Sequence, residues 1–368
     1  MTHALAWVVW VAAILIILST TRNPWYLGAV LACLVVVRSA SRAGADSVGP
    51  GPISLGRFGL LVVSFSAVFN ALTVHFGDTR LFALPEAIPF FGGLVTLEAL
   101  VYGALNGLAL TGLVAAFVVF NQAVSPRELV RLVPRAFYPI AIITSIALTF
   151  VPVTLRHYQA IREAQAVRGH HLRGLRDWLP LLMPLLIGGL ERAFQLAEAM
   201  TARGFAGSQT ESPARFKLLI LGGLLLVLAG WLLRLVWGLA ITGLLMLALG
   251  LGLVIVTLWL EGRRVPRTRY RPQAWQGQDW AVVGGAVMAA WLFAVPWPGL
   301  DRSSIFYYPY PRLSWPGYDW LPGLLLLGLL SPALPALRKL GLAASRSLAR
   351  PEGEPPRTVE AGTDYDSL

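Results

Sequence analysis

One short pattern occurs twice in this chain and combines residue types that can bind a partner at a helix end. Glu163–Gly169 has the sequence Glu-Ala-Gln-Ala-Val-Arg-Gly, and Glu198–Gly204 has the sequence Glu-Ala-Met-Thr-Ala-Arg-Gly. The two copies stand about ten helical turns apart along the chain. Arginine stays protonated and presents a rigid fork of donors, which suits a partly desolvated groove lined by carboxylates or helix C-terminal carbonyls. Two copies therefore predict two matching surfaces on partner molecules.

The glycine that follows each arginine predicts the end of a helix. Glycine weakens a helix interior and is favoured where the backbone turns at a C-terminal end, so Gly169 and Gly204 would bring each tip close to another surface. Val167 and Ala202 stand directly before the arginines Arg168 and Arg203. An alternative is that these arginines only satisfy terminal carbonyls and the helix dipole. Repetition of the pattern within one segment favours the partner-binding interpretation.

Each copy begins with a glutamate, Glu163 in the first and Glu198 in the second. The glutamate lies five positions before the arginine, which is more than one helical turn and outside the spacing of a direct helical ion pair. We therefore expect Glu163 and Glu198 to support packing or a polar network beside the tips.

The composition predicts a polytopic membrane protein. Hydrophobic residues make up 56% of the 368 residues, charged residues 13%, and the mean hydropathy is +0.64, far from the balance of soluble domains. A spanning helix needs roughly 20 apolar residues, and segments near that length recur: Ala4–Ser19, Trp25–Val37, Phe58–Phe76, Glu98–Phe120, Leu218–Leu233, Leu235–Leu260, Trp280–Val295 and Leu321–Leu337. The predicted fold is all-α, with about eight transmembrane helices in a bacterial-type cell membrane.

Arginine-rich loops predict the orientation of these spans. The net charge of +11 does not form one basic face on a soluble domain, and no nucleic-acid-binding module is present, so nucleic acid is not an expected partner. Lysine and arginine favour cytoplasmic loops, and one threading places the amino terminus, the tail and every basic loop inside. The basic loops are Arg38–Arg57, Arg127–Arg135, Arg156–Lys217, Arg263–Arg271 and Arg338–Arg350.

The segment Ser125–Lys217 begins with an apolar stretch that does not fit the threading as a span. Ala136–Val153 has cytoplasmic arginines on both sides, so it is predicted to lie along the cytoplasmic leaflet or dip into it. Pro139 and Pro152 are expected to bend this helix, because proline removes a backbone donor and crowds the preceding turn.

A pair of helices with Arg-Gly ends is predicted to follow. Leu155–Val167 has a helix-compatible composition and ends at Gly169, after which Gly174 and Pro180 break the chain. A second helix is expected from about Leu182 to Arg203. The segment would thus form a cytoplasmic helical hairpin or crossed pair between the fourth and fifth spans.

Two features outside the tips leave two interpretations open. The loop Pro296–Pro322 is dense in Trp, Tyr and Pro, as expected of rings that collect at a membrane interface, with a substrate or partner site as the alternative. Glu98, at the start of a span, would either line a polar path, as acidic groups in membranes often do, or cap its helix.

Common catalytic and cofactor-binding motifs are missing from the sequence. It has no Gly-x-x-x-x-Gly-Lys-Ser/Thr loop, no His-Glu-x-x-His, and no paired acidic motif suited to magnesium and a prenyl diphosphate. We expect no ATP binding, no cofactor, no metal site and no enzymatic activity. The alternative is an integral-membrane lipid or isoprenoid-phosphate transferase whose arginines bind a phosphate headgroup. Its candidate residues are Arg162, Arg168, Arg173 and Arg176.

Several motifs resemble those of one family, the transmembrane T component of energy-coupling factor transporters, a branch of the ATP-binding cassette importers. Leu97–Gly103 is similar to the family's Leu-Glu-Gly-Leu-x-Tyr-Gly element, and Phe150-Val151-Pro152 is similar to its Phe-x-Pro element. The family's two Ala-Arg-Gly signatures fall on Val167-Arg168-Gly169, where valine replaces alanine, and on Ala202-Arg203-Gly204.

The resemblance implies a scaffold without catalysis of its own. It would couple two cytoplasmic ATPase subunits to a small membrane substrate-binding subunit, the S component, with Arg168 and Arg203 each seated in a groove of one ATPase. Closure of the ATPase pair would move the two coupling helices and tilt the S component, which releases cargo inside. The S component would determine specificity, so both vitamins and transition-metal ions are possible cargo.

The resemblance covers roughly Trp25–Leu233 and suggests five parts of the chain. They are N-terminal transmembrane helices (1–124), a cytoplasmic or interfacial coupling-helix domain (125–215), the family's C-terminal transmembrane helix (216–234), additional transmembrane helices (235–340) and a disordered cytoplasmic tail (341–368). The tail is predicted to be disordered because it is rich in proline, glycine and acidic residues and has almost nothing to bury.

Overall fold

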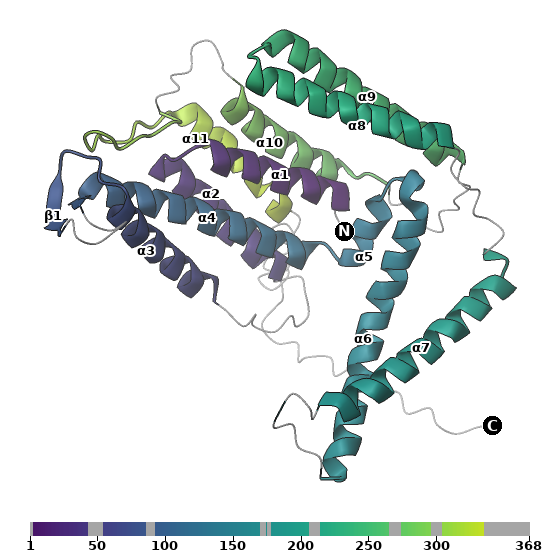
Figure 1. Ribbon diagram of the computed structural model, residues 1–368. Helices are drawn as coiled ribbons and strands as arrows, with labels where there is room; N and C mark the ends of the chain where they lie inside the picture. The colour runs from purple at the N-terminus through teal and green to yellow at the C-terminus, as the bar shows by residue number, and fades with distance from the viewer. Residues whose placement is uncertain are drawn as a thin grey trace, which may run out of the picture. The chain divides into compact units, whose positions relative to one another are not determined.

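The computed structural model of this chain is almost entirely helical over the residues that it describes (Figure 1). These are residues 3–42, 54–85, 93–169, 174, 178–205, 214–264, 274–295 and 304–334. They fall into two compact units: unit 1 comprises Met1–Val124 and Gln273–Leu368, and unit 2 comprises Ser125–Pro272. The predicted disordered tail, 341–368, lies outside the described residues.

Unit 1 joins helices from the two ends of the chain. Its elements are α1 (Ala4–Thr20), α2 (Pro24–Arg42), α3 (Leu55–Thr73), α4 (Leu97–Ala123), α10 (Gly277–Ala294), α11 (Trp320–Leu326) and the 3-10 helix η4 (Leu327–Ala333). α1 is apolar almost throughout, so it must be covered on several sides. It packs on both α4 and α10, and Trp10, Ile14 and Ile17 are fully buried.

A small β-hairpin connects α3 to α4 and was not predicted from the sequence. Strands β1 (Arg80–Leu84) and β2 (Gly93–Thr96) pair antiparallel, and the register shifts between Arg80 and Phe82. Strands of four and five residues are too short to show a clear period of two between long apolar spans. The described residues are therefore helical, as predicted, except for this one two-stranded hairpin.

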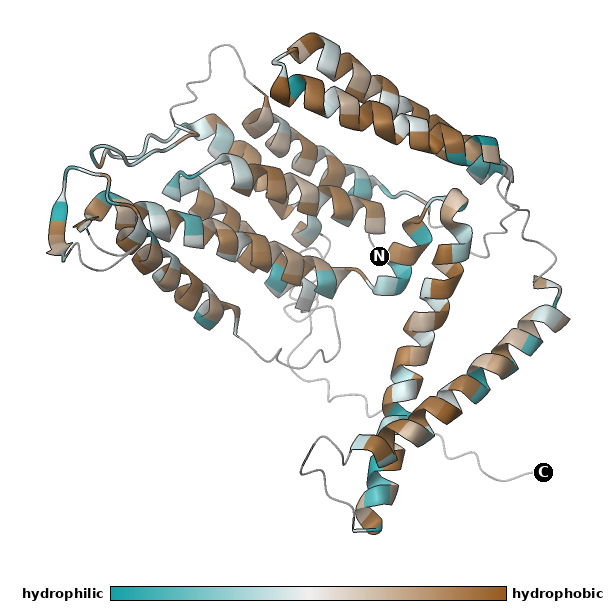
Figure 2. Cartoon of the chain, viewed as in Figure 1, coloured by the Kyte–Doolittle hydropathy of each residue, from teal (hydrophilic) through white to brown (hydrophobic). Residues whose placement is uncertain are grey.

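Unit 2 contains the helices that end in the two Arg-Gly patterns. Its elements are α5 (Pro126–Leu132), the 3-10 helix η1 (Arg135–Phe137), α6 (Tyr138–Val167), α7 (Leu179–Ala202), α8 (Ala214–Val236) and α9 (Ala240–Arg264). α8 and α9 pack along each other, and α9 also contacts η1. Figure 2 shows that α8 and α9 are hydrophobic along most of their length, as expected of helices that face lipid.

The prediction of two consecutive helices before the first tip is wrong. The segments predicted at Ala136–Val153 and Leu155–Val167 form one 30-residue helix, α6, which continues through Pro152. Pro139 stands in the first turn, where the N–H that proline lacks would have no hydrogen-bond partner within the helix. Pro152 removes a single internal hydrogen bond, and the regular turns on both sides keep the remainder.

The class of a polytopic helical membrane protein is confirmed. Among the described residues, seven helices are long and apolar enough to cross a membrane: α2, α3, α4, the stretch Arg135–Val167, α7, α8 and α9. α1 and Trp320–Ala333 are shorter apolar helices. α6 and α7 thus qualify by length and composition, although the arginine pattern predicts a cytoplasmic or interfacial position for them. That position and the orientation of the spans remain predictions.

Candidate functional site

The first Arg-Gly pattern forms the C-terminal end of α6. Arg168 is the C-cap residue, with φ −81° and ψ 7°, and its N–H donates to the carbonyl of Gln165 at 3.1 Å. Gly169 follows with φ +77° and donates to the carbonyl of Ala166 at 2.9 Å. A positive φ is readily available only to glycine. The sequence therefore places the turn at the residue directly after the arginine.

The second pattern forms the end of α7 with almost the same backbone. Arg203 is the C-cap residue with φ −85° and ψ 6°, and Gly204 follows with φ +77°. The N–H of Gly204 donates to the carbonyl of Thr201 at 2.9 Å, which matches the bond made by Gly169. The prediction that both helices end at these glycines is confirmed, and the two tips are equivalent in backbone conformation.

Both tips are open to their surroundings. Val167 is 90% exposed, and the other signature residues, Arg168, Gly169, Ala202, Arg203 and Gly204, are also exposed. A Cβ added at either glycine meets nothing within 4 Å, so these positions need glycine for its dihedral and not for space. Across the part of the chain that the structure describes, neither guanidinium has a hydrogen bond or ion pair.

Glu163 and Glu198 are exposed on the helices that lead to the tips. Within the described residues no ion pair joins either carboxylate to the arginine of its own pattern, which agrees with a spacing of more than one helical turn. Their expected role in packing or in a polar network stays a prediction.

α6 and α7 contact each other as a crossed pair. Figure 1 shows α7 crossing α6 near the end of α6 and then extending away, so the two tips lie at different ends of the pair. Only 6% of the span-like window of each helix is buried. One stripe of α7 at helical spacing is well exposed and consists of Met183, Leu186, Leu190 and Phe194. Such a stripe needs either lipid or a partner protein to cover it.

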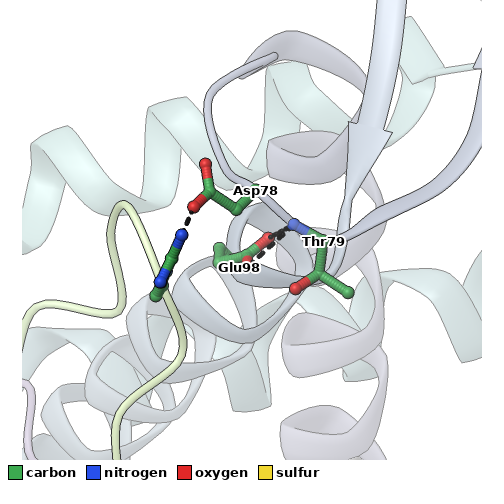
Figure 3. Close-up of polar contacts among 4 residues, drawn as sticks. Asp78, Thr79 and Glu98 are labelled. Carbon is green, nitrogen blue, oxygen red and sulfur yellow. Dashed lines mark hydrogen bonds and ion pairs between the residues drawn. The ribbon is translucent and has the colours of Figure 1, made fainter.

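The Leu97–Gly103 motif forms the start of α4 and fastens the loop that precedes it. Glu98 is completely buried, and its carboxylate accepts the backbone N–H of Thr79 at 3.1 and 3.3 Å (Figure 3). The side chain of Thr96, not that of Glu98, caps the helix, by accepting the N–H of Ala99. Glu98 therefore neither caps its helix nor shows a polar path. Its observed contact links the start of α4 to the loop that contains Thr79.

Asp78, next to the N–H that Glu98 binds, pairs with a cation from the loop before α11. Its carboxylate lies 2.7 Å from Nε of Arg312, and both side chains are exposed. A dashed line from Asp78 marks this ion pair in Figure 3. Asp78 raises the pKa of Arg312 through this hydrogen bond. An exposed pair of this kind contributes little stability, but it shows that the loops before α4 and α11 meet. The sequence carries no signal for this ion pair, because Asp78 and Arg312 are far apart in the chain.

Two further motif residues, Tyr102 and Gly103, hold other parts of unit 1. The ring of Tyr102 lies 5.8 Å from that of Tyr308 and 5.6 Å from that of Tyr310. A Cβ at Gly103 would lie 2.6 Å from the carbonyl oxygen of Ser66, so only glycine permits the close approach of α3 and α4. The motif thus joins a loop, an aromatic cluster and a helix contact.

The aromatic loop is only partly the membrane-interface belt that the sequence suggested. Trp315 is 92% exposed, as a belt residue can be, whereas Tyr307 and Tyr310 are buried. Burial, with contributions from Tyr308, Tyr102 and Glu98, raises the pKa of Tyr310 to about 12. Part of this loop therefore packs on α4.

Only two of the four arginines that the alternative transferase hypothesis invokes lie within the described residues. Arg162 and Arg168 lie near the end of α6, where both are exposed, while Arg173 and Arg176 lie outside the described residues. No group of three or more His, Cys, Asp or Glu residues that could hold a metal ion occurs within the described ranges.

The fold defines a multi-pass protein of the cell membrane, in which two exposed helix ends have equivalent backbone conformation. A family model, CbiQ, described as cobalt transport protein, matches residues 3–213, which is more than half of the chain and includes both tips. The chain belongs to this family. The match ends before α8, so α8, α9 and the helices of unit 1 that follow them lie outside it.

Curated relatives agree with the resemblance that the motifs showed. A protein of Exiguobacterium sibiricum named energy-coupling factor transporter transmembrane protein EcfT is 33% identical over 127 residues, 33% of this chain and 41% of the relative. Proteins of the same name from Bacillus selenitireducens and Staphylococcus aureus are 26% and 27% identical over 45% and 40% of this chain, and the matches cover 66% and 60% of the relatives. The chain thus spans less than two thirds of each relative's length.

Proposed function

We propose that this chain is the transmembrane T component of an energy-coupling factor importer for a vitamin or a transition-metal ion. The observation that carries the proposal is the pair of exposed Arg-Gly tips with matching backbone angles. Two like tips suit two like ATPase subunits, each with a groove that accepts one guanidinium. The chain itself would be a non-catalytic scaffold, and ATP hydrolysis would belong to the ATPase partners.

Motion would pass from the ATPases to the membrane through the crossed pair of α6 and α7. When the two ATPase subunits close, Arg168 and Arg203 would be drawn together, and the long helices behind them would change their crossing. A packed element with two arrangements can transmit such a displacement. Each helix ends in the same turn, at Gly169 or Gly204, so each arginine has a defined position relative to the helix behind it.

The exposed apolar stripe of α7 is the proposed contact for the substrate-binding S component. Met183, Leu186, Leu190 and Phe194 recur three or four positions apart, so they lie on one face of the helix. A small apolar membrane protein seated on this stripe would tilt when α7 moves. This gives the scaffold one charged connection to each ATPase and one apolar connection to the cargo-binding subunit.

The test is capture of the ATPase pair by tagged chain coexpressed with both ATPases and an S component. Arg168→Ala or Arg203→Ala should lower the retained ATPase about tenfold or more, because each change removes a charged anchor from a desolvated groove. The double variant should lose more than either single variant. Membrane insertion should stay intact, because neither guanidinium has a partner among the described residues.

Arg192→Ala is the matched control for these variants. Arg192 lies on α7 outside both signatures, and its Nε donates to the carbonyl of Gly188 at 3.0 Å, so its loss should leave ATPase capture unchanged. Normal ATP-driven uptake by the double variant would refute the proposed coupling. Transferase activity of the isolated chain would instead favour the enzyme hypothesis.

A further inference from the structure

A cavity of about 890 Å³ lies between α2, α3 and α4 in unit 1. α2 and α3 both pack against α4. The cavity lies between the face of α2 and the face of α3 that do not contact α4. Its walls are mainly apolar and include Leu31, Leu34, Leu60, Val63, Leu108 and Ala115. The family motifs and the proposed coupling helices do not use this cavity.

The length of the cavity matches one leaflet of a bilayer. The residues that line it run from Leu31 to Ser39 on α2, from Ser54 to Ser64 on α3 and from Leu108 to Val119 on α4. At 1.5 Å per residue these stretches are roughly 12 to 17 Å long. Half of a hydrocarbon core is about 15 Å, so the apolar walls have the depth of one layer of acyl chains.

One end of the cavity is cationic and polar. Arg38 is the one charged residue among those that line it, and Ser39 and Ser54 stand at the same end, where α2 finishes and α3 begins. Ser54 is the N-cap of α3 but makes no side-chain capping bond, and the first N–H groups of a helix favour an anion. A phosphate at this end would meet a guanidinium and hydroxyl groups, which bind phosphate well.

The side of the cavity is open toward the membrane. Val35 and Leu60, which both line it, are 61% and 73% exposed, and only 17% of the span window of α3 is buried. An acyl chain can therefore enter laterally from the surrounding lipid. The arginine-rich stretch that contains Arg38 is predicted to be cytoplasmic, which places the polar end at the inner headgroup layer.

We propose that this cavity binds one anionic glycerophospholipid of the inner leaflet. An acyl chain fills the apolar groove, and the phosphate lies at Arg38, Ser39 and Ser54. The bound lipid thus contacts both α2 and α3 across the cavity. The proposal depends on the cavity and its charge, and it stands or falls independently of the proposed transport function.

The test is lipid retention measured by native mass spectrometry on the full chain. Delipidated protein in detergent receives phosphatidylglycerol or phosphatidylcholine with identical acyl chains. Wild-type chain should retain one phosphatidylglycerol about fivefold better than phosphatidylcholine, as expected for one arginine facing an anionic lipid. Arg38→Gln should reduce this preference to about one, and Arg38→Lys should keep most of it.

A second pair of variants tests the apolar groove. Gly56 lines the cavity, and a Cβ there meets nothing within 4 Å, so the backbone accepts a side chain at this position. The ring of Gly56→Phe should occupy the groove and abolish retention of both lipids. Gly28→Phe is the matched control: this helical glycine of α2 also has open space but does not line the cavity, and lipid retention should be unchanged. Wild-type retention in Gly56→Phe, or an unchanged headgroup preference in Arg38→Gln, would overturn the proposal.

Discussion

Gly169 and Gly204 define the shape of the two tips through one backbone dihedral each. Both have φ +77°, in the left-handed region where a side chain costs roughly 1–2 kcal/mol. Neither glycine is crowded, so their requirement is conformational. The sequence was sufficient to predict this feature, because a helix end marked by glycine depends on local backbone energetics and not on distant contacts.

Replacement of these glycines should impair coupling without unfolding the protein. In Gly169→Ala the turn after Arg168 becomes strained, so ATPase capture should fall several-fold, while thermal unfolding of the isolated chain should change little because the tip packs on nothing described. Gly189→Ala is the control, since Gly189 lies inside α7 with open space around it, and alanine stabilises a helix interior by about 0.5–1 kcal/mol. Equal ATPase capture by all three chains would show that the left-handed turn is dispensable.

Glu98 illustrates what the sequence could not predict about single residues. The motif identified Glu98, Tyr102 and Gly103 as important, but their partners are Thr79, the aromatic loop and α3. Those partners are supplied by the tertiary fold, and residue types alone do not specify them. A buried carboxylate at the start of a span resembled a functional site, whereas its observed contact is structural.

The lengths of the apolar segments predicted most helices, whereas a proline inside one of them led to a wrong boundary. Seven of the eight predicted apolar segments each correspond to one helix in the structure, with ends shifted by a few residues. The eighth, Leu321–Leu337, falls on α11 and the 3-10 helix η4, and its last three residues lie outside the described residues. Two helices were predicted on either side of residue 154, just after Pro152, yet one helix continues through both segments, because a long apolar helix retains nearly all of its hydrogen bonds around one proline. The β-hairpin was missed, since its short strands pair through a loop whose geometry the sequence does not show.

The loop packed on α4 should come apart in alkaline solution. The pKa of Tyr310 is raised from 10.0 to about 12, so the folded loop favours the protonated hydroxyl. This contribution to stability is fully present below pH 10 and is lost as the pH rises through about 12. The near-ultraviolet circular dichroism of the tyrosine cluster should therefore disappear over this interval.

Two single-tyrosine variants identify the group responsible for this transition. Tyr310→Phe cannot ionise and should retain the dichroism to higher pH, whereas Tyr158→Phe on α6 should behave as wild type. Arg312, whose pKa is raised by Asp78, should stay charged throughout and should not contribute. A transition of unchanged position in Tyr310→Phe would assign the loss to another group.

The last helices of the chain, α10, α11 and η4, lie beyond the family match and are part of unit 1. The match ends at residue 213, and the motifs in the sequence assign no role to the later spans. In the structure, α10 and η4 pack on α1 and α2, and Nε1 of buried Trp10 donates to the carbonyl of Leu329 at 3.0 Å. Asn23, between α1 and α2, donates to the carbonyls of Ser304 and Gly317 at 2.6 and 2.7 Å.

These contacts predict that the chain cannot be shortened to its family portion plus α8 and α9. A chain that ends at Pro272 keeps all of unit 2 but leaves Trp10 and Asn23 without their hydrogen-bond partners from the C-terminal part of the chain. Buried polar groups without partners cost about 1–3 kcal/mol each, and uncovered aromatic surface adds to the loss. The shortened chain should therefore unfold at a markedly lower temperature in detergent and elute as a broad, aggregated species.

A second shortened chain distinguishes loss of these contacts from loss of length. Ending the chain at Leu334 keeps the contacts that α10, α11 and η4 make with the other described residues, so its unfolding temperature should equal that of the full chain. If the chain ending at Pro272 is equally stable, α10, α11 and η4 are an appendage and α1 is stable without them. If it alone is destabilised, the portion of this chain that matches the family depends on helices outside the match for its own core.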